Sequence, residues 1–585
     1  MQKHLPDKWG LVSLLLLIAG AVTFNLSLYS LATANAFPLY TLLAGIFLQA
    51  LAVTLFVALL LRDNHGETPQ NFYLIFILVL SVSLAFTRLS RYAGFNGFDF
   101  VRESEVMQNT FRSGRWDLSL GLVSNYQSSL GITILPVMAS RFLLVPADQV
   151  LLLQTFLLTA LLPLVVLGVV SSLTGNLKFG TLSAALLAQN WFFFGAHIIG
   201  KTSLALVFCV LSFYYLLRPE SRARAIGVLL GLGVAWAHYT VALMLVFILL
   251  ALLVWSKMVV PLLRHFSQFE NAKSIPVNVW PVAATVGLVV VWLLVAAPGI
   301  LPALFNSSSQ LFSSLSNVVS GPQRVSNSLA ISSDAGPLVT YWFDFQNGLI
   351  GFGSLLWLNA YRKGNLQGRL AGWLFVGISL IILLLCFLFL PYLSISVEST
   401  RILAIILPFT ILFSGVILLH ALRRPGRMLK AAALGIVFLM LPMNMMLPNQ
   451  DQNILYHGLD SLSIPKKISV ESISLPTDSN GAMDLWIVTN VPLNNPVEVD
   501  AVGRYALITA VPFPQQVLFL QEHSPPYGWK HYGILSSYFM IDGTWSIATL
   551  GNRTFVPADP SPFFSPTHDV IYSSSKFWVV VGRNP

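Results

Sequence analysis

Long apolar runs alternate with short polar connections along the first three quarters of the chain. A helix of about 20 apolar residues crosses a bilayer, and runs near that length recur about thirteen times before residue 447. The predicted spans are 11–31, 39–61, 72–87, 149–172, 179–195, 202–217, 225–237, 240–256, 279–303, 336–358, 370–393, 402–421 and 430–446. The pattern predicts an all-α polytopic membrane protein.

Two of these runs are irregular. The first ends at Ala34-Asn35-Ala36, which is typical of a signal-peptidase site, but it is longer than the apolar part of a signal peptide, so we expect a retained span. The run 225–237 is the shortest and is interrupted by Trp236-Ala-His238-Tyr239, so it is either a short span or half of a broken helix.

The composition changes sharply at Pro448. From there Pro, Gly, Asn and Asp separate short β-type runs such as 485–488, 505–509, 517–520 and 577–581. We therefore divide the chain into a transmembrane domain, 1–446, and a small mixed α/β or β domain, 447–585. Within the first domain, 88–148 and 304–335 are long loops. The second loop has little charge and few large apolar side chains, which favours a mobile segment that could serve as a lid.

Composition supports the membrane assignment. Hydrophobic residues make up 55% of the chain and charged residues 10%, with a mean hydropathy of +0.73, which lies outside the range of soluble domains. Both cysteines, Cys209 and Cys386, lie in apolar runs, so neither a disulfide framework nor a thiolate metal site is expected.

The basic residues predict the orientation. Of 33 Lys and Arg, 17 fall in connections that are cytoplasmic if the N-terminus is cytoplasmic, and only Lys201, Arg324 and Arg401 fall in the short outer connections. The remainder lie in the loop 88–148 and in the tail, which are too long for this rule. We expect a multi-pass plasma-membrane protein with both long loops and the C-terminal domain outside. Topology thus explains the net charge of +9 without a nucleic-acid partner.

The densest cluster of acids and bases is 94–117, after the third span. On a helix, Asp99 and Glu103 share a face with Arg102 beside them, while Val106 and Phe111 could contact a membrane surface. Such an acidic pair can act as a general base, bind a divalent cation or orient a sugar hydroxyl. The structural alternative is a solvated face of an interfacial helix. Glu105 lies on the opposite side.

Further candidates lie at outer span ends. Arg401 could hold a lipid phosphate through its guanidinium, or snorkel to a headgroup. Lys201 and His238-Tyr239 could bind a substrate, or serve as an interfacial anchor and a hydrogen-bonded buried histidine. Phosphate-binding loops, Gly-x-Ser-x-Gly elbows, His-Glu-x-x-His helices and dinucleotide fingerprints are absent from the sequence.

Three segments of the chain form a recognisable pattern: Gly97-Phe-Asp99-x-x-x-Glu103, Gly114-x-Trp116-Asp117 and Tyr126-Gln-Ser-Ser-Leu-Gly-Ile-Thr-Ile-Leu-Pro136. Together they resemble the first outer loop of GT-C superfamily glycosyltransferases. The pattern is most similar to an uncharacterised family of archaeal and bacterial membrane proteins of this kind, and the resemblance covers about 72–446. The chain differs from better-known members in having two spans between the first span and this loop, and in lacking an adjacent Asp-Glu, which leaves acceptor class and metal dependence open.

The resemblance implies a GT-C-like fold and a function. The donor would be a sugar on a polyprenyl phosphate or pyrophosphate, and the acceptor a glycan, lipid or protein at the outer face. Asp99 would be the general base of an inverting transfer, with Glu103 orienting it or holding a divalent cation; no other cofactor is implied. The donor phosphate would be bound by Arg401, Lys201 and His238. Possible substrate contacts are Arg102, Glu105, Tyr239 and Arg324.

Three alternatives remain from the sequence. A lipid-linked glycan polymerase or ligase of the O-antigen type would also use outer Arg and His but would not need Asp99. A transporter would need charged residues at mid-membrane, where the predicted spans have almost none. A receptor would depend on 447–585 and not on Asp99 or Arg401.

Overall fold

The computed structural model describes most of the transmembrane domain and seven strands of the tail. The described residues are 8–34, 39–62, 69–92, 98–116, 127–190, 201–266, 269, 274–297, 337–366, 368–389, 399–423 and 426–446, with strands between 497 and 582. The loop 304–335, including Arg324, and the β-type runs 485–488 and 505–509 lie outside these residues.

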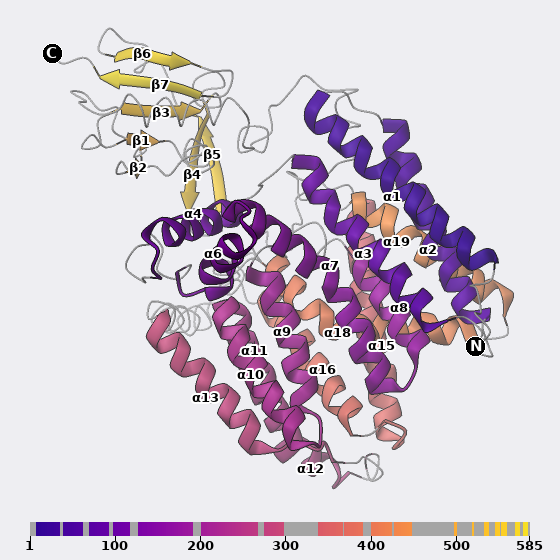
Figure 1. Cartoon of the computed structure of the whole chain (residues 1–585). Helices are drawn as coiled ribbons and strands as arrows, with labels where there is room; N and C mark the ends of the chain where they lie inside the picture. The colour runs from indigo at the N-terminus through magenta and orange to yellow at the C-terminus, as the bar shows by residue number, and fades with distance from the viewer. Residues whose placement is uncertain are drawn as a thin grey trace.

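Helices cover the N-terminal part of the chain (Figure 1). They are α1 (Lys8–Ala34), α2 (Leu39–Arg62), α3 (Gln70–Tyr92), α4 (Phe98–Ser113), α6 (Leu130–Leu143), α7 (Ala147–Thr174), α8 (Leu177–Ala188), α9 (Lys201–Leu216), α10 (Ser221–Ala237), α11 (Tyr239–Val254), a π-helical segment (Trp255–Val259), α12 (Val260–Leu263), α13 (Val279–Ala296), α15 (Pro337–Arg362), α16 (Arg369–Phe389), α18 (Ser399–Arg423) and α19 (Arg427–Met446).

A helix lies at the position of every predicted span, which confirms the helical membrane fold. By length and composition alone, eight helices in the described part of the chain can cross a membrane. The other five, α3, α8, α9, α10 and α15, coincide with the shorter or more polar runs. Local hydrophobicity therefore located the helices, although the lengths of several do not by themselves require a crossing.

Helix α18 forms the centre of the bundle. Within its span 89% of the residues are buried, against 28% for both α13 and α19, which lie at the periphery. It packs against α15, α16 and α8. A Cβ atom at Gly353 of α15 would overlap the carbonyl oxygen of Phe413, so glycine is required where α15 crosses α18.

Helices α4 and α6 lie across one end of the bundle, over the ends of α9 and α10 (Figure 1). They belong to the predicted outer loop 88–148. With 14 residues, α6 is too short to cross a bilayer, which needs about 20. Its Met138 and Phe142 are nonetheless exposed, so α6 presents an apolar face suited to the membrane interface.

The described strands lie beyond the helical bundle, on the side of α4 and α6 (Figure 1). A five-stranded mixed sheet has the order β2-β1-β3-β7-β6, with β1 parallel to β2 and β3, and β7 antiparallel to β3 and β6. Strands β4 and β5 form a separate antiparallel pair. Strand β2 lies within the predicted run 517–520, and β7 covers the predicted run 577–581 and extends one residue beyond it. The strand bounds are β1 (Val497–Val499), β2 (Val517–Phe519), β3 (Tyr532–Ser536), β4 (Thr544–Thr549), β5 (Asn552–Pro557), β6 (His568–Ser573) and β7 (Phe577–Gly582).

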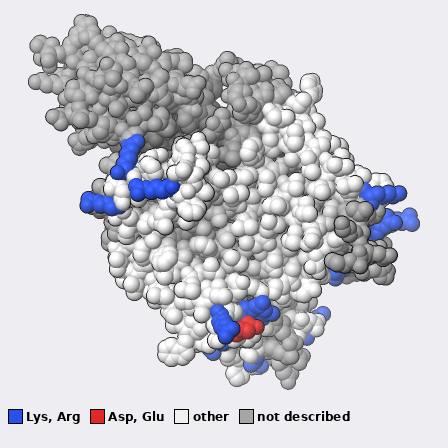
Figure 2. Space-filling view, in the orientation of Figure 1, with Lys and Arg blue, Asp and Glu red and all other residues white. Residues whose placement is uncertain are grey.

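Charged side chains avoid the middle of the described surface. Figure 2 shows Lys and Arg near α4 and α6, near α12, and at the edge beside α2 and α19, with a broad uncharged surface between these groups. A wide uncharged belt is expected where helices face lipid chains.

Candidate active site beneath helix α4

Helix α4 is the helix that the spacing of Asp99 and Glu103 predicts. It ends after Ser113 because Gly114 takes a left-handed conformation (φ 67°), and the Gly114 N–H donates to the carbonyl oxygen of Thr110 at 3.1 Å. In the sequence, Gly114-Arg115-Trp116 is typical of such a helix stop, and α4 ends there. The left-handed backbone is why glycine occupies this position.

The apolar face of α4 packs on protein. Val106 and Met107 are buried in a cluster with Ile132 of α6 and Leu151 of α7, and Phe111 packs against this cluster. The sequence suggested that Val106 contacts the membrane surface, but in the structure it is buried against protein. The reason is that α6 folds beneath α4 and supplies an apolar partner of its own. This packing holds α4 against the end of the bundle.

Glu103, one turn before Met107, forms a buried ion pair with Lys201. The Lys201 Nζ lies 3.3 Å from Glu103 Oε1, and the side chains are 2% and 1% exposed. Desolvating either charge alone would cost several kcal/mol. Lys201 is also the first residue of α9, where the helix dipole disfavours a cation. The carboxylate of Glu103 offsets both penalties, so the pair ties α4 to α9.

The start of α6 packs against α9 and against the end of α10. A Cβ at Gly131 would meet Leu204 of α9 and Ala237 at the end of α10. Leu204 is one turn after Lys201, and Ala237 directly precedes His238. Residues 127–131 therefore lie between the α9 and α10 ends that carry these two candidates.

Three tryptophans, Trp116, Trp236 and Trp292, pack together next to the end of α4. Trp116, just after α4, donates its Nε1–H to the carbonyl oxygen of Gln127 at 2.8 Å. Its ring stacks on Trp292 of α13 with centroids 6.2 Å apart, and Trp236 of α10 lies edge-on to Trp292 at 6.0 Å. From the sequence alone, a Trp after a helix stop is typical of an interfacial anchor. In the fold Trp116 joins α4, α6 and α13.

His238 separates α10 from α11, as the sequence predicted. Its backbone is extended, and its Nδ1 accepts a hydrogen bond from the Thr240 N–H at 3.0 Å, which caps α11. The His238 side chain is buried, and the centroids of its imidazole and of the Tyr239 ring are 5.0 Å apart. Nδ1 thus has a structural role as the cap of α11.

Gln127 is a site residue that the sequence analysis did not single out. It is fully buried, yet neither its Oε1 nor its Nε2 has a hydrogen-bond partner among the described residues. The Ser129 hydroxyl is in the same state. Buried amides are nearly always hydrogen-bonded, so these groups are suited to a polar ligand. The Tyr126-Gln-Ser-Ser segment of the family pattern was the available signal.

The remaining candidates are placed by their backbone alone. Asp99, Arg102 and Glu105 lie on α4, with Asp99 one turn before Glu103, and Arg401 lies in the first turn of α18; the positions of these four side chains are outside the described part. Asp344, on α15, is exposed.

A divalent cation does not fit Glu103 as the structure has it, because an ammonium group already lies 3.3 Å from the carboxylate. Within the described ranges, no group of three or more His, Cys, Asp or Glu side chains could hold a metal.

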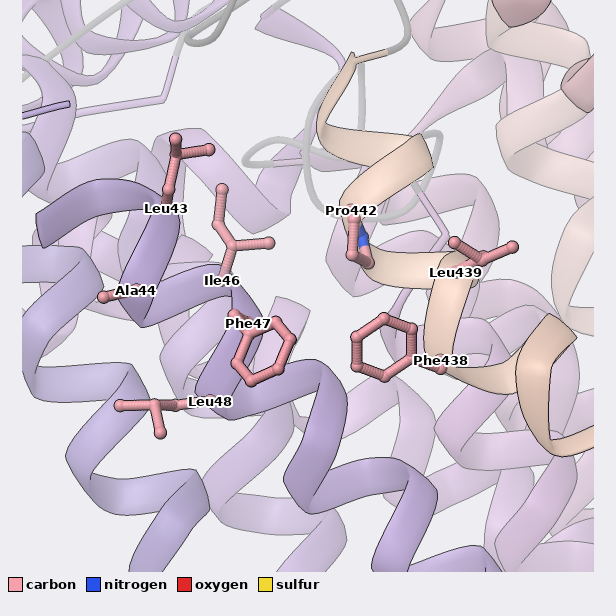
Figure 3. A pocket seen from close by; sticks show the side chains of 8 residues that line it. All are labelled: Leu43, Ala44, Ile46, Phe47, Leu48, Phe438, Leu439 and Pro442. Atoms are coloured by element: carbon pink, nitrogen blue, oxygen red, sulfur yellow. The ribbon is translucent and has the colours of Figure 1, made fainter. Parts of the chain in front are cut away.

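A hollow between α2 and α19 has no charged or polar side chain in its lining. It has a volume of about 530 Å³, and Figure 3 shows Phe47 and Phe438 facing each other across it. Its lining is entirely apolar, so it offers lipid chains a surface but no group for catalysis.

Comparisons with known proteins add one finding. No protein-family model matches the chain, and no curated protein matches it. Among solved structures, the chain is similar to ArnT from Cupriavidus metallidurans bound to undecaprenyl phosphate, with 12% identity, a TM-score of 0.43, and coverage of 84% of this chain and 98% of that one. A likeness this distant assigns neither an activity nor a residue role.

Proposed function

We propose that this chain is an integral-membrane glycosyltransferase that moves a sugar from a polyprenyl-phosphate or pyrophosphate donor to an acceptor at the outer face. The buried Glu103–Lys201 pair carries the proposal. It anchors the acidic helix α4 over the bundle at one end, where α6, α9 and α10 also bring Gln127, Ser129 and His238. The motif resemblance of 97–136 supplies the reaction class.

The buried ion pair is better suited to positioning than to reaction. Glu103 and Lys201 neutralise each other at 3.3 Å, so neither is an effective free base or free cation while they remain paired. Asp99, one turn earlier on the same helix, is left as the proposed base. Rigid support of α4 would hold that residue at a fixed place relative to the bundle.

In the proposed reaction the acceptor O–H or N–H attacks the anomeric carbon and its proton passes to the Asp99 carboxylate. The new bond forms as the bond from the anomeric carbon to the phosphate oxygen breaks. The lipid phosphate leaves with that electron pair, and Arg401 stabilises its charge. Attack opposite the leaving group inverts the anomeric centre.

The test is transfer of radiolabelled sugar from a panel of polyprenyl-phosphate donors in membranes that contain the wild type or Asp99→Asn. Loss of a general base should lower transfer by roughly 10²- to 10⁴-fold at equal abundance. Asp344→Asn is the matched control, because it removes an exposed carboxylate from a helix predicted to begin on the same side.

An Asp99→Asn protein as active as the wild type would overturn the proposal and favour a polymerase or ligase that does not use this residue. If no donor in the panel is used, complementation of a deletion strain by the same variants decides. Equal rescue by Asp99→Asn and wild type would also contradict the proposed role.

A further inference from the structure

A polar hollow lies at the end of the bundle opposite α4. Helix α9 runs from Lys201 at the ion pair to Leu216, 16 residues that span ~24 Å at the rise of an α-helix. Just beyond its end, a hollow of about 730 Å³ is lined by Leu217, Arg218 and residues from the ends of α10, α13 and α16. Figure 1 shows this end, near α12, away from α4.

Four cations line this hollow: Arg218, Arg224, Lys257 and Arg369. Glu220 lies nearby in sequence but is not among the lining residues. Within the described part of the chain, no ion pair to a carboxylate is formed by any of the four. Like charges gathered in one hollow repel each other, so the arrangement favours a bound anion.

Two of the guanidinium groups have buried N–H donors that no acceptor in the described structure uses. Arg224 donates from Nη2 to the carbonyl oxygen of Pro219 at 2.6 Å, yet its Nε is buried without a partner. The Nη1 of Arg369 is buried in the same way. An unmade hydrogen bond from a buried charged group is costly, and a phosphate oxygen is the acceptor that a guanidinium fork matches best.

The rim of the hollow is apolar. Trp280 is 83% exposed and, with Val279, begins α13 beside the hollow. Exposed tryptophan at a span end is typical of the level of lipid headgroups. A phosphate in the hollow would therefore sit where its glycerol and acyl chains could continue along the exposed apolar side chains of α13.

We propose that this hollow binds the phosphate of an anionic phospholipid headgroup from the leaflet opposite the proposed active site. The lipid would connect the end of α9 with the starts of α10, α13 and α16. Binding would stabilise the folded bundle without contact with Glu103, Lys201 or α4. The proposal does not depend on the enzymatic function.

The test uses the purified full chain in detergent, with thermal unfolding measured against added phosphatidylglycerol, phosphatidylcholine or inorganic phosphate. Phosphatidylglycerol should raise the midpoint, since a ligand that binds only the folded state stabilises it. Arg224→Gln, Arg369→Gln and the exposed Lys257→Gln should each weaken the apparent affinity roughly fivefold. Arg62→Gln and Arg427→Gln are controls, because these exposed arginines do not line the hollow.

Stabilisation by phosphatidylglycerol alone supports the lipid headgroup. Equal stabilisation by inorganic phosphate overturns the lipid assignment and identifies a soluble phosphate as the ligand. Equal effects of phosphatidylglycerol and phosphatidylcholine, or equal losses in the hollow and control variants, overturn the anion site altogether. Because Lys257 is exposed, Lys257→Gln should fold even if an arginine variant does not.

Discussion

Two buried polar clusters in this protein are built on opposite principles. Between α8, α15 and α19, neutral amides form a connected chain of hydrogen bonds: Asn190 Nδ2 donates to Gln346 Oε1, Gln346 Nε2 donates to Asn444 Oδ1, and Asn444 Nδ2 donates to the Gln189 carbonyl oxygen. Trp342 Nε1 is a second donor to Asn444 Oδ1. Beneath α4, by contrast, a charged pair joins α4 to α9, and the buried amide of Gln127, just before α6, has no hydrogen-bond partner in the described structure.

The difference separates a structural cluster from a candidate site. Neutral hydrogen bonds between membrane helices contribute modest stability and need no ligand. A buried ion pair and an unsatisfied amide are poor ways to gain stability, since apolar side chains would serve as well or better. The presence of the ion pair and of the Gln127 amide at the α4 end of the bundle therefore favours a functional role for that end.

The largest effect is expected from breaking the ion pair. Lys201→Met removes the ammonium group that lies 3.3 Å from the buried carboxylate of Glu103 and should cost about 3–5 kcal/mol of stability. Adding Glu103→Gln removes that charge, so the double variant should recover most of the loss. Thermal unfolding in detergent compares the stability of the wild type, the two single variants and the double variant. Transfer activity should stay low in Lys201→Met and in the double variant. A single variant as stable as the wild type would contradict the structural role of the pair.

A smaller loss is expected in the amide network. Asn444→Leu removes the acceptor of Gln346 Nε2 and Trp342 Nε1 and the side-chain donor to the Gln189 carbonyl oxygen, at a cost of about 1–3 kcal/mol. Activity per folded molecule should not change, because the network lies outside the proposed site. Asn359→Leu, an exposed asparagine on α15, is the matched control. Lost activity at normal stability would show that the network also has a catalytic role.

The Trp116 hydrogen bond should matter less. Trp116→Phe keeps an aromatic ring against Trp292 but loses the donor to the Gln127 carbonyl oxygen, which should cost about 1 kcal/mol. The expected result is a small decrease in midpoint. Trp280→Phe, at an exposed position, should change the midpoint less. Equal midpoints for Trp116→Phe and Trp280→Phe would show that the hydrogen bond from Trp116 to the Gln127 carbonyl oxygen does not stabilise the fold.

The smallest change in stability, but a distinct change in activity, is expected at Gln127. Gln127→Leu removes two buried polar atoms without described partners, so stability should stay level or rise. If Gln127 contacts substrate, transfer at low donor or acceptor concentration should fall about tenfold, which is the effect of one lost hydrogen bond. Gln154→Leu breaks a bond to the Gly131 carbonyl oxygen and should lower stability instead.

If Gln127→Leu were instead less stable than the wild type but had normal kinetics, Gln127 would have a structural role like that of Asn444 and no role in substrate binding. The contrast between the two clusters would then rest on the ion pair alone.

Local features of the sequence determined where most elements lie. Apolar runs located the helices, the spacing of Asp99 and Glu103 identified α4, and the polar interruption at His238 separated α10 from α11. These features depend on neighbours within a few residues, whose hydrophobicity and backbone preferences can be evaluated without knowing the fold. Helix α6 was not identified, because 14 residues fall below the length expected for a span.

Only the tertiary structure decided which helix ends meet. Glu103 and Lys201 are separated in sequence by α6, α7 and α8, and Lys201 alone is indistinguishable from an interfacial anchor. Likewise, Arg224 and Arg369 are ordinary basic residues at span ends until packing brings both to one hollow. The physical reason is that hydrophobicity drives a segment into the membrane whatever its neighbours, whereas a buried charge is stable only beside a partner that the packing of distant helices supplies.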